Sequence, residues 1–188
     1  MLELSFTTDF ETERLTLRRF SSEDVDSVFK NWASLPEVQL NYAEPVYATK
    51  EEAASLLEKY IARYAEPNYY RWAVIEKESG ECIGQIAYFL VDSKNEFAEI
   101  EYCIGTAFQK KGYATEACKS VIKYGFEKIG LHKVQICVRP SNTPSRKVIE
   151  KCGFTYEGAL RDYFKMPDGS FEDRIYFSIL QKEFKKEE

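Results

Sequence analysis

One short segment of the sequence combines the residue types needed to bind a phosphate group. It is Gln109-Lys110-Lys111-Gly112-Tyr113-Ala114-Thr115, which lies between a strand-like segment, 97–104, and a long helical one. A helix N-terminus offers unpaired N–H groups and a partial positive charge, and Gly112 would let this backbone come close to an anion. Lys110 and Lys111 add two cations, so the segment favours a pyrophosphate. The alternative is a glycine-containing loop with surface lysines that only begins a helix.

The same segment excludes two common phosphate-binding motifs. It lacks the GKS or GKT of a P-loop, and it lacks the GxGxxG of a dinucleotide-binding fold.

Another pair of residues, Asn142 and Ser145, is spaced for capping a short helix. In such a cap the side chain of the first residue accepts a hydrogen bond from the backbone N–H of the second.

A single histidine restricts acid–base chemistry. His132 lies in GLHKV, a turn leading into a strand, where we expect a surface or structural role. One imidazole excludes a zinc site that needs two within a chain, and we expect no metal. Proton transfer must therefore use carboxylate, serine, cysteine, tyrosine or lysine side chains.

The five cysteines are odd in number, form no CxxC pair and mostly lie in apolar runs: Cys82, Cys103, Cys118, Cys137 and Cys152. We expect buried thiols in a reducing cytosol.

Composition indicates a folded chain with one domain, 1–188, and a core of about 12–181. Of 188 residues, 44% are hydrophobic, 30% charged and 15% aromatic, which excludes a disordered or collagen-like chain. The net charge of −5 argues against direct binding to nucleic acid or to an anionic membrane. No export signal or membrane-spanning run is recognisable, so we expect a cytoplasmic protein.

Hydrophobic periodicity predicts an α+β fold with a mixed, mostly antiparallel sheet of about seven strands and about four helices. Thr49 and Glu52 predict a capping box, Pro36 a helix stop, and Pro167 to Gly169 a turn between the last two strands. The predicted strands are 13–20, 70–77, 81–92, 97–104, 133–138, one beginning at 154, and 174–180.

Several motifs in a fixed order resemble the GNAT superfamily of acetyl-coenzyme A-dependent N-acetyltransferases. They are an E-I-x-Y-x-I strand at 99–104, Q-x-x-G-x-A at 109–114, N-x-x-S at 142–145 and E-K-x-G-F at 150–154. The opening TERLTLRRF and the distal LRDYFKMPDGSFEDRIYFSIL are similar to the branch containing ribosomal-protein N-terminal acetyltransferases of the RimJ and RimL type. The resemblance covers about 12–180.

The resemblance implies acetyl-CoA as co-substrate. Gln109 to Thr115 would hold its diphosphate, Asn142 would contact the coenzyme, and the main chain of Tyr102, Cys103 and Ile104 would pair with the pantetheine arm. Direct transfer in the family argues against Cys103 as a nucleophile.

The resemblance also implies the groups for proton transfer. Ser145 would protonate the leaving thiolate, with Tyr163 as a competing acid, and Glu99 would take the proton of the amine. Glu99 and Glu101 have the same strand parity, so spacing does not choose between them. Glu101 stands where the family commonly has glycine, a departure that could narrow the acceptor site or make Glu101 the working carboxylate.

The expected acceptor is a primary amine, on a peptide or a small molecule. The branch resemblance favours the α-amine of a protein N-terminus, with a ribosomal protein as possible partner. Open alternatives are a small amine, amino acid or antibiotic, a non-catalytic acyl-CoA sensor, and a nucleotide-phosphate binder. A monomer and a homodimer are both compatible with the sequence.

Overall fold

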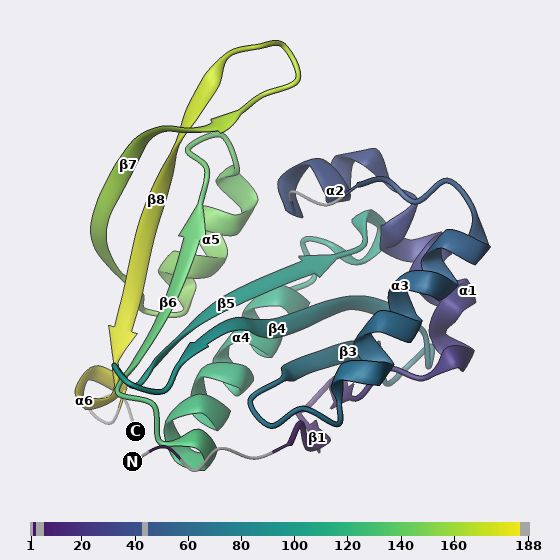
Figure 1. Ribbon diagram of the computed structural model, residues 1–188, viewed down its shortest axis with the longest axis horizontal. Helices are drawn as coiled ribbons and strands as arrows, with labels where there is room; N and C mark the ends of the chain where they lie inside the picture. The colour runs from purple at the N-terminus through teal and green to yellow at the C-terminus, as the bar shows by residue number, and fades with distance from the viewer. Residues whose placement is uncertain (1, 3–5, 43–44, 185–188) are drawn as a thin grey trace. The chain divides into compact units, whose positions relative to one another are not determined.

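The computed structural model describes residues 2, 6–42 and 45–184 and contains eight strands and six α-helices in these ranges (Figure 1). The strands are β1 (Phe10–Glu11), β2 (Leu15–Arg18), β3 (Tyr70–Glu76), β4 (Cys82–Asp92), β5 (Phe97–Ile104), β6 (Lys133–Val138), β7 (Thr155–Lys165) and β8 (Phe171–Leu180). The helices are α1 (Val25–Val28), α2 (Pro36–Tyr42), α3 (Lys50–Arg63), α4 (Tyr113–Tyr124), α5 (Thr143–Lys151) and α6 (Gln181–Phe184).

The strands form a sheet in the order β1-β2-β3-β4-β5-β6-β8-β7. Strands β5 and β6 pair in parallel, whereas β1–β2, β2–β3, β3–β4, β6–β8 and β7–β8 are antiparallel. The predicted α+β fold with a mixed, mostly antiparallel sheet is confirmed. The strand beyond the predicted seven is β1, whose two residues are too short to give a periodic signal.

The chain divides into two compact units. Of the described residues, 6–42, 45–89 and 101–121 form the N-terminal unit, and 90–100 and 122–184 with residue 2 form the C-terminal unit.

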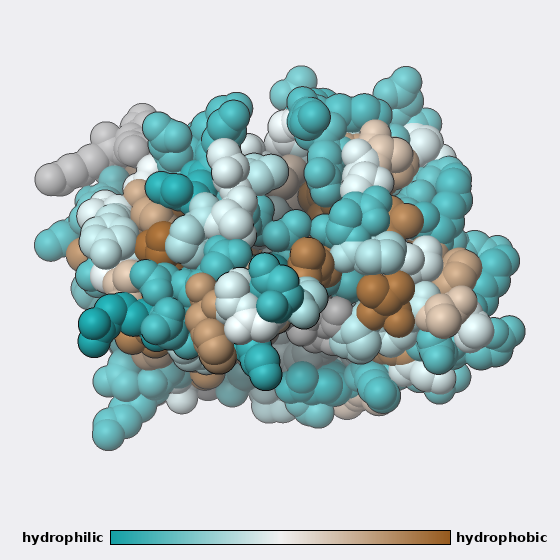
Figure 2. Space-filling view, turned by 90° about the horizontal axis from the view of Figure 1, so that it is seen from above, coloured by the Kyte–Doolittle hydropathy of each residue, from teal (hydrophilic) through white to brown (hydrophobic). Residues whose placement is uncertain are grey.

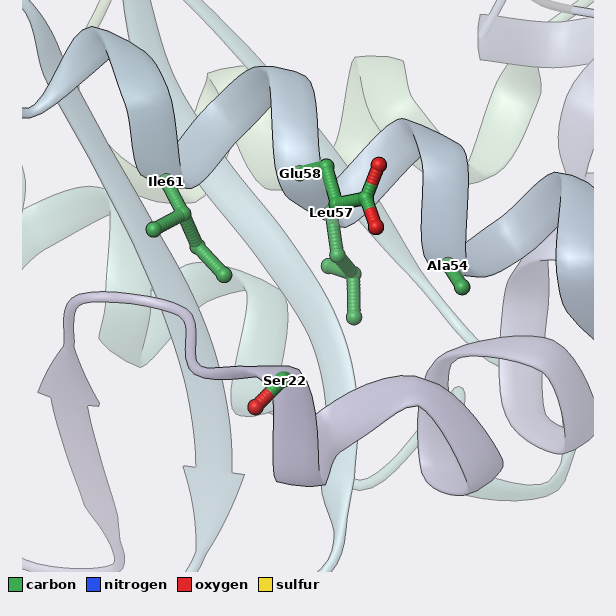
Figure 3. Close-up of a pocket in the computed structure, with 5 residues that line it drawn as sticks. All are labelled: Ser22, Ala54, Leu57, Glu58 and Ile61. Atoms are coloured by element: carbon green, nitrogen blue, oxygen red, sulfur yellow. The ribbon is translucent and has the colours of Figure 1, made fainter.

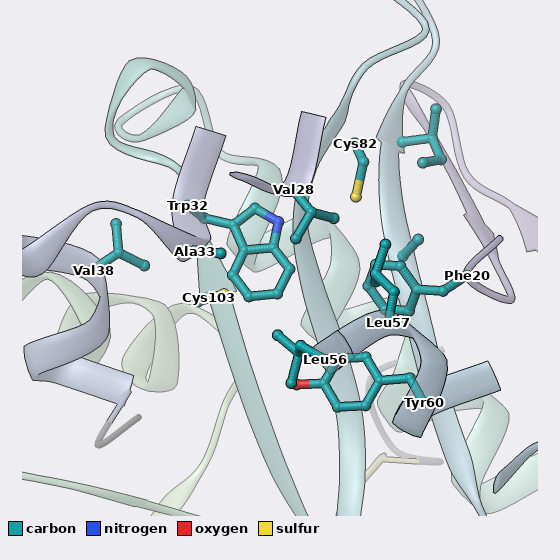
Figure 4. Packing of buried hydrophobic residues seen from close by; sticks show 12 residues of the cluster. Phe20, Val28, Trp32, Ala33, Val38, Leu56, Leu57, Tyr60, Cys82 and Cys103 are labelled. Atoms are coloured by element: carbon teal, nitrogen blue, oxygen red, sulfur yellow. The ribbon is translucent and has the colours of Figure 1, made fainter. Parts of the chain in front are cut away.

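An apolar cluster in the N-terminal unit holds α1 and α3 against β3 and β4 (Figure 4). Trp32 is fully buried there, Leu57 of α3 is almost fully buried, and the rings of Phe20 and Tyr60 lie 5.5 Å apart. Helix α3 begins where the sequence predicts, because Thr49 Oγ1 accepts the Glu52 N–H at 3.2 Å. Glu52 in return accepts the N–H of Ala48.

Pro36 lies just after the end of one helical segment and is the first residue of the next helix. The preceding helical segment ends in a π-helical turn at Phe29–Ala33, and Pro36 is the first residue of α2, where its missing N–H costs no helical hydrogen bond. Buried Gln39 donates to the carbonyls of Ala33 at 3.0 Å and Trp32 at 3.3 Å, which satisfies the end of the first segment. The predicted stop is therefore also a start.

The C-terminal unit contains β6, β7 and β8 with α5, whose Ile149 is buried. Met166 and Ser170 are hydrogen-bonded across the predicted turn at Pro167 to Gly169. Strand β7 ends the strand order, and almost all of its residues are exposed. Its pairing with β8 shifts register between Tyr156 and Gly158 and again between Leu160 and Phe164.

Hydrophilic side chains dominate the face shown in Figure 2, with apolar residues in separate patches. Within the described ranges, the helices are too short or too polar to cross a membrane.

Candidate functional site

The segment from Gln109 to Thr115 forms the start of α4, in the N-terminal unit. Lys110 and Gly112 both have left-handed backbone conformations, with φ of 63° and 88°. The N–H of Glu116 donates to the Gly112 carbonyl at 3.0 Å, so Tyr113, Ala114 and Thr115 contribute the N–H groups of the first helical turn. The predicted helix start is confirmed, and its backbone has the donors that an anion needs.

The side chains of this loop are held by neighbours in the N-terminal unit. Gln109 donates from its amide to the Ile104 carbonyl at 2.9 Å, which ties the loop to the end of β5. Tyr113 is buried and donates to Glu76 at 2.5 Å, while Lys111 Nζ lies 3.9 Å from the same carboxylate. Hydrogen bonds from Tyr113 and Ser79 lower the pKa of Glu76 from its usual value. The side chain of Tyr113 thus anchors the loop and leaves its main chain for a ligand.

Arg14 is a loop neighbour that sequence reasoning missed. Its guanidinium binds Glu116, donates to the Lys111 carbonyl at 2.9 Å and lies 4.7 Å from the centre of the Tyr113 ring. The one local sign of this contact in the sequence was Glu116 in the first turn of α4, which does not show that Arg14 is its partner.

Tyr102, Cys103 and Ile104 form the end of β5 in the N-terminal unit. The parallel pairing of β5 with β6 covers Phe97–Ile100 and Lys133–Ile136, and β5 itself continues to Ile104. Cys103 is buried, and burial raises its pKa above that of a free thiol. A raised pKa leaves less of the thiolate, which is the nucleophilic form.

Glu101 and Glu99 have very different surroundings. In the N-terminal unit, Arg71 Nη2 donates to Glu101 at 2.6 Å, and a quarter of the Glu101 side chain is exposed. The guanidinium of Arg71 also lies over the Tyr60 ring at 4.2 Å. Glu101 is therefore a paired carboxylate at the surface of its unit.

In the C-terminal unit, Glu99 is only 2% exposed. Its Oε1 accepts Arg174 Nη2 at 2.7 Å, and its Oε2 accepts Gln135 Nε2 at 2.8 Å. The sequence alternative of a surface glutamate is wrong, because residues on both sides of this part of β5 are covered. A buried carboxylate with a guanidinium partner is a preorganised anion.

Arg174 also links Glu99 to a candidate acid. Its Nη1 donates to the Tyr163 hydroxyl at 2.9 Å, and its guanidinium carbon lies 4.9 Å from the Tyr163 ring and 4.8 Å from the Tyr176 ring. Because the Tyr163 oxygen accepts this bond, its own proton is directed elsewhere. Half of Tyr163 is exposed.

Asn142 and Ser145 cap α5 in the C-terminal unit. Asn142 Oδ1 accepts the Ser145 N–H at 3.2 Å, which confirms the capping alternative. The bond uses the backbone of Ser145, so its half-buried side chain is not needed for the cap.

The side chain of His132 is exposed, and its main chain bonds Glu96 and Gln181. The five cysteines are free thiols, and Cys137 is less buried than the other four. In the described part of the chain no cluster of histidine, cysteine and acidic residues is arranged to hold a metal ion.

We expect iodoacetamide at pH 8 to modify the native cysteines slowly, with Cys137 reacting before Cys82 and Cys103. Burial raises the pKa of Cys137 to about 11 and that of Cys82 to about 12. A raised pKa leaves less reactive thiolate at this pH, so the native rate should fall about 100-fold below the urea-unfolded rate. Peptide mass spectrometry over time measures each rate, and fast modification of Cys103 would contradict the expectation.

A small cavity of about 50 Å³ lies between α3 and Ser22 in the N-terminal unit (Figure 3). It is lined by Ser22, Ala54, Leu57, Glu58 and Ile61. This volume suits a water molecule and is far too small for a coenzyme.

Comparison with known proteins agrees with the fold. The acetyltransferase (GNAT) domain family matches residues 14–155. The uncharacterized N-acetyltransferase p20 of Bacillus licheniformis is 35% identical over 173 residues, covering 92% of this chain and 96% of its own. YdaF of Bacillus subtilis (strain 168), provisionally named a ribosomal N-acetyltransferase, is 30% identical over 93% of this chain and 96% of its own.

A solved structure of spermidine N-acetyltransferase from Vibrio cholerae, in complex with CoA and spermine, is also similar. It superposes with a TM-score of 0.77 at 25% identity, covering 92% of this chain and 99% of that one. The protein is therefore an acyltransferase, and the chain belongs to the GNAT family of N-acetyltransferases.

Proposed function

We propose that this N-acetyltransferase uses acetyl-CoA to acetylate the α-amine of a protein or peptide N-terminus, with a ribosomal protein as a natural acceptor. The observation that carries the acceptor is the similarity to YdaF over nearly the whole of both chains. The net charge of −5 supports it, since it favours encounter with a cationic partner.

The loop at the start of α4 fits the diphosphate of the coenzyme. Gly112 has no side chain, and a Cβ there would meet only the end of Arg14, at 3.3 Å. The backbone of Gly112 to Thr115 can therefore approach an anion, with Lys110 and Lys111 adding positive charge. We assign the main chain of Tyr102, Cys103 and Ile104 to the pantetheine arm and Asn142 to a further coenzyme contact.

Two proton transfers accompany the reaction. The coenzyme supplies the acetyl thioester, and Glu99 is proposed to accept the proton of the acceptor amine, directly or through water. A carboxylate has about four lone-pair positions, and the hydrogen bonds from Arg174 and Gln135 use two of those on Glu99. The hydroxyl of Ser145 is proposed to protonate the leaving thiolate.

The chemistry of an α-amine suits such a modest base. Its unperturbed pKa is about 7.7 to 8.0, against about 10.4 for lysine, so far more of it is already neutral at pH 7. A carboxylate base therefore needs to deprotonate a smaller fraction of an N-terminal amine than of a lysine side chain.

A spermidine-type polyamine is the second candidate acceptor, favoured by the similarity to spermidine N-acetyltransferase and by the negative charge of the chain. Thiol release should be measured with a peptide that has a free N-terminus, with its Nα-blocked twin carrying an internal lysine, and with spermidine. We expect the free peptide to give the highest kcat/KM. Preference for the blocked twin or for spermidine would overturn the proposed acceptor, and coenzyme binding without turnover on a broad panel of amines would favour the sensor.

Gly112→Val should weaken acetyl-CoA binding by at least about 1 kcal/mol, because a side chain keeps the backbone N–H groups from the diphosphate. Gly80→Val is the matched control. Gly80 also has a positive φ, of 72°, and has open space around it, so it shares the backbone strain away from the loop. Calorimetry on both folded variants measures the affinity, and equal affinities would contradict the loop assignment.

Ser145→Ala should lower kcat about 100-fold with little change in coenzyme affinity, since general acid catalysis is lost while the α5 cap is kept. Tyr163→Phe tests the competing acid and should leave kcat within about threefold of the wild type. Single-turnover kinetics at saturating acetyl-CoA separates the chemical step from product release. A large loss of kcat in Tyr163→Phe with little loss in Ser145→Ala would show that Tyr163 is the general acid.

A further inference from the structure

Arg14 joins the chain segment before β2 to the first turn of α4. Four donors hold the Glu116 carboxylate: Oε1 accepts Thr12 Oγ1 at 2.6 Å and the Arg14 N–H at 2.8 Å, while Oε2 accepts Arg14 Nε and Nη2, both at 2.7 Å. Two nitrogens of the guanidinium share Oε2, and two contacts to one oxygen fix the orientation of the guanidinium as well as its position. The guanidinium is therefore held at the loop.

Nη1, on the other arm of the same guanidinium, donates to the Lys111 carbonyl at 2.9 Å. That carbonyl lies between the two left-handed residues, Lys110 and Gly112. In a trans peptide the C=O and the following N–H point in opposite directions. Holding the Lys111 carbonyl toward Arg14 thus directs the Gly112 N–H away from Arg14.

The Tyr113 ring supports this arrangement. It lies under the guanidinium at 4.7 Å, and its hydroxyl is fixed by Glu76. The two contacts hold the residue that follows Gly112, so the directions of successive peptide groups are determined before a ligand arrives.

We propose that Arg14 is a positioning residue for the coenzyme: through the Lys111 carbonyl it orients the N–H groups at the start of α4 toward the diphosphate. This role rests on the proposed binding of the diphosphate by this loop. Arg14 is ion-paired with Glu116, so it acts by orienting the backbone, whereas Lys110 and Lys111 contribute positive charge.

Arg14→Lys is the decisive variant, because it keeps the charge but lacks the fork that reaches Glu116 and the Lys111 carbonyl together. We expect KM for acetyl-CoA and the calorimetric Kd for CoA to rise about tenfold, the size of one lost charge-assisted hydrogen bond. KM for the acceptor and kcat at saturating acetyl-CoA should be unchanged. The increase should be the same at low and high salt. The double variant Lys110→Ala with Lys111→Ala should instead lose more affinity at low salt, where exposed charges are less screened.

S-acetylpantetheine separates positioning from general damage, because it carries the thioester without the diphosphate. Arg14→Lys should leave kcat/KM for this substrate unchanged, and the exposed Arg19→Lys should change neither substrate. Equal losses with both acetyl donors, or an unchanged KM for acetyl-CoA, would overturn the role of Arg14. If Gly112→Val also binds CoA normally, the loop assignment itself fails; if only Gly112→Val loses affinity, the loop stands and Arg14 alone is refuted.

Discussion

Replacing Glu99 by glutamine should lower kcat by about 10²- to 10⁴-fold while the dissociation constant for CoA changes little. Glutamine has nearly the same shape but cannot take a proton from an ammonium group. The measurement is kcat for an N-terminal peptide, together with CoA affinity by calorimetry. At high pH the acceptor ammonium group loses its proton to solvent without a base. The difference in kcat between the variant and the wild type should therefore shrink as the pH rises toward the pKa of the amine.

Glu99→Gln also leaves the Arg174 guanidinium without its counter-ion, and this needs a control. The double variant Glu99→Gln with Arg174→Gln replaces the ion pair by two neutral amides, so it removes the buried unpaired charge. If Glu99 accepts the proton, the double variant stays inactive. Recovery of kcat in the double variant would show that the single variant fails because the Arg174 charge is unpaired, and Glu101→Gln would then test the other carboxylate.

Gly84→Ala should destabilise the fold by about 3 kcal/mol or more, because the added methyl group would overlap backbone atoms. A Cβ at this position would lie 2.1 Å from the Cys103 carbonyl and 2.9 Å from Ile104 Cδ1, so backbone would have to move. The displaced residues belong to the strand assigned to pantetheine, and acetyl-CoA affinity should fall as well. Urea denaturation followed by the fluorescence of buried Trp32 and Trp72 measures the loss.

Gly80→Ala is the control for this substitution, since nothing lies within 4 Å of its added methyl group. Gly80→Ala should lower the free energy of unfolding by only about 1 kcal/mol, because alanine is strained at the positive φ of this position. A Gly84→Ala protein as stable as Gly80→Ala would contradict the close approach of β4 to the end of β5.

Local features of the fold were predictable because their causes are local. The Thr49–Glu52 capping box, the turn at Pro167 to Gly169 and the helix start at Gly112 each depend on residues within about five positions. Pro36 was only half predicted, because a proline that ends one helix is equally suited to begin the next.

The pairing of charges was not predictable, because it depends on contacts between distant segments. Arg14 meets Glu116 across 102 residues, and Arg174 meets Glu99 across 75. Strand parity cannot distinguish Glu99 from Glu101; they differ in what covers them. The roles proposed for Glu99, Ser145 and the coenzyme-binding residues come from the family resemblance, and the experiments above test them.

Strand β7 has a consequence for how copies of this enzyme behave when crowded. It is the last strand of the sheet, and an outer strand with a regular backbone is a template on which further strands can add without limit. The two register shifts and the left-handed Asp162, with φ of 50°, interrupt that template every few residues. Exposed Tyr156 and Leu160 can then face water beside a backbone too irregular to seed a fibril.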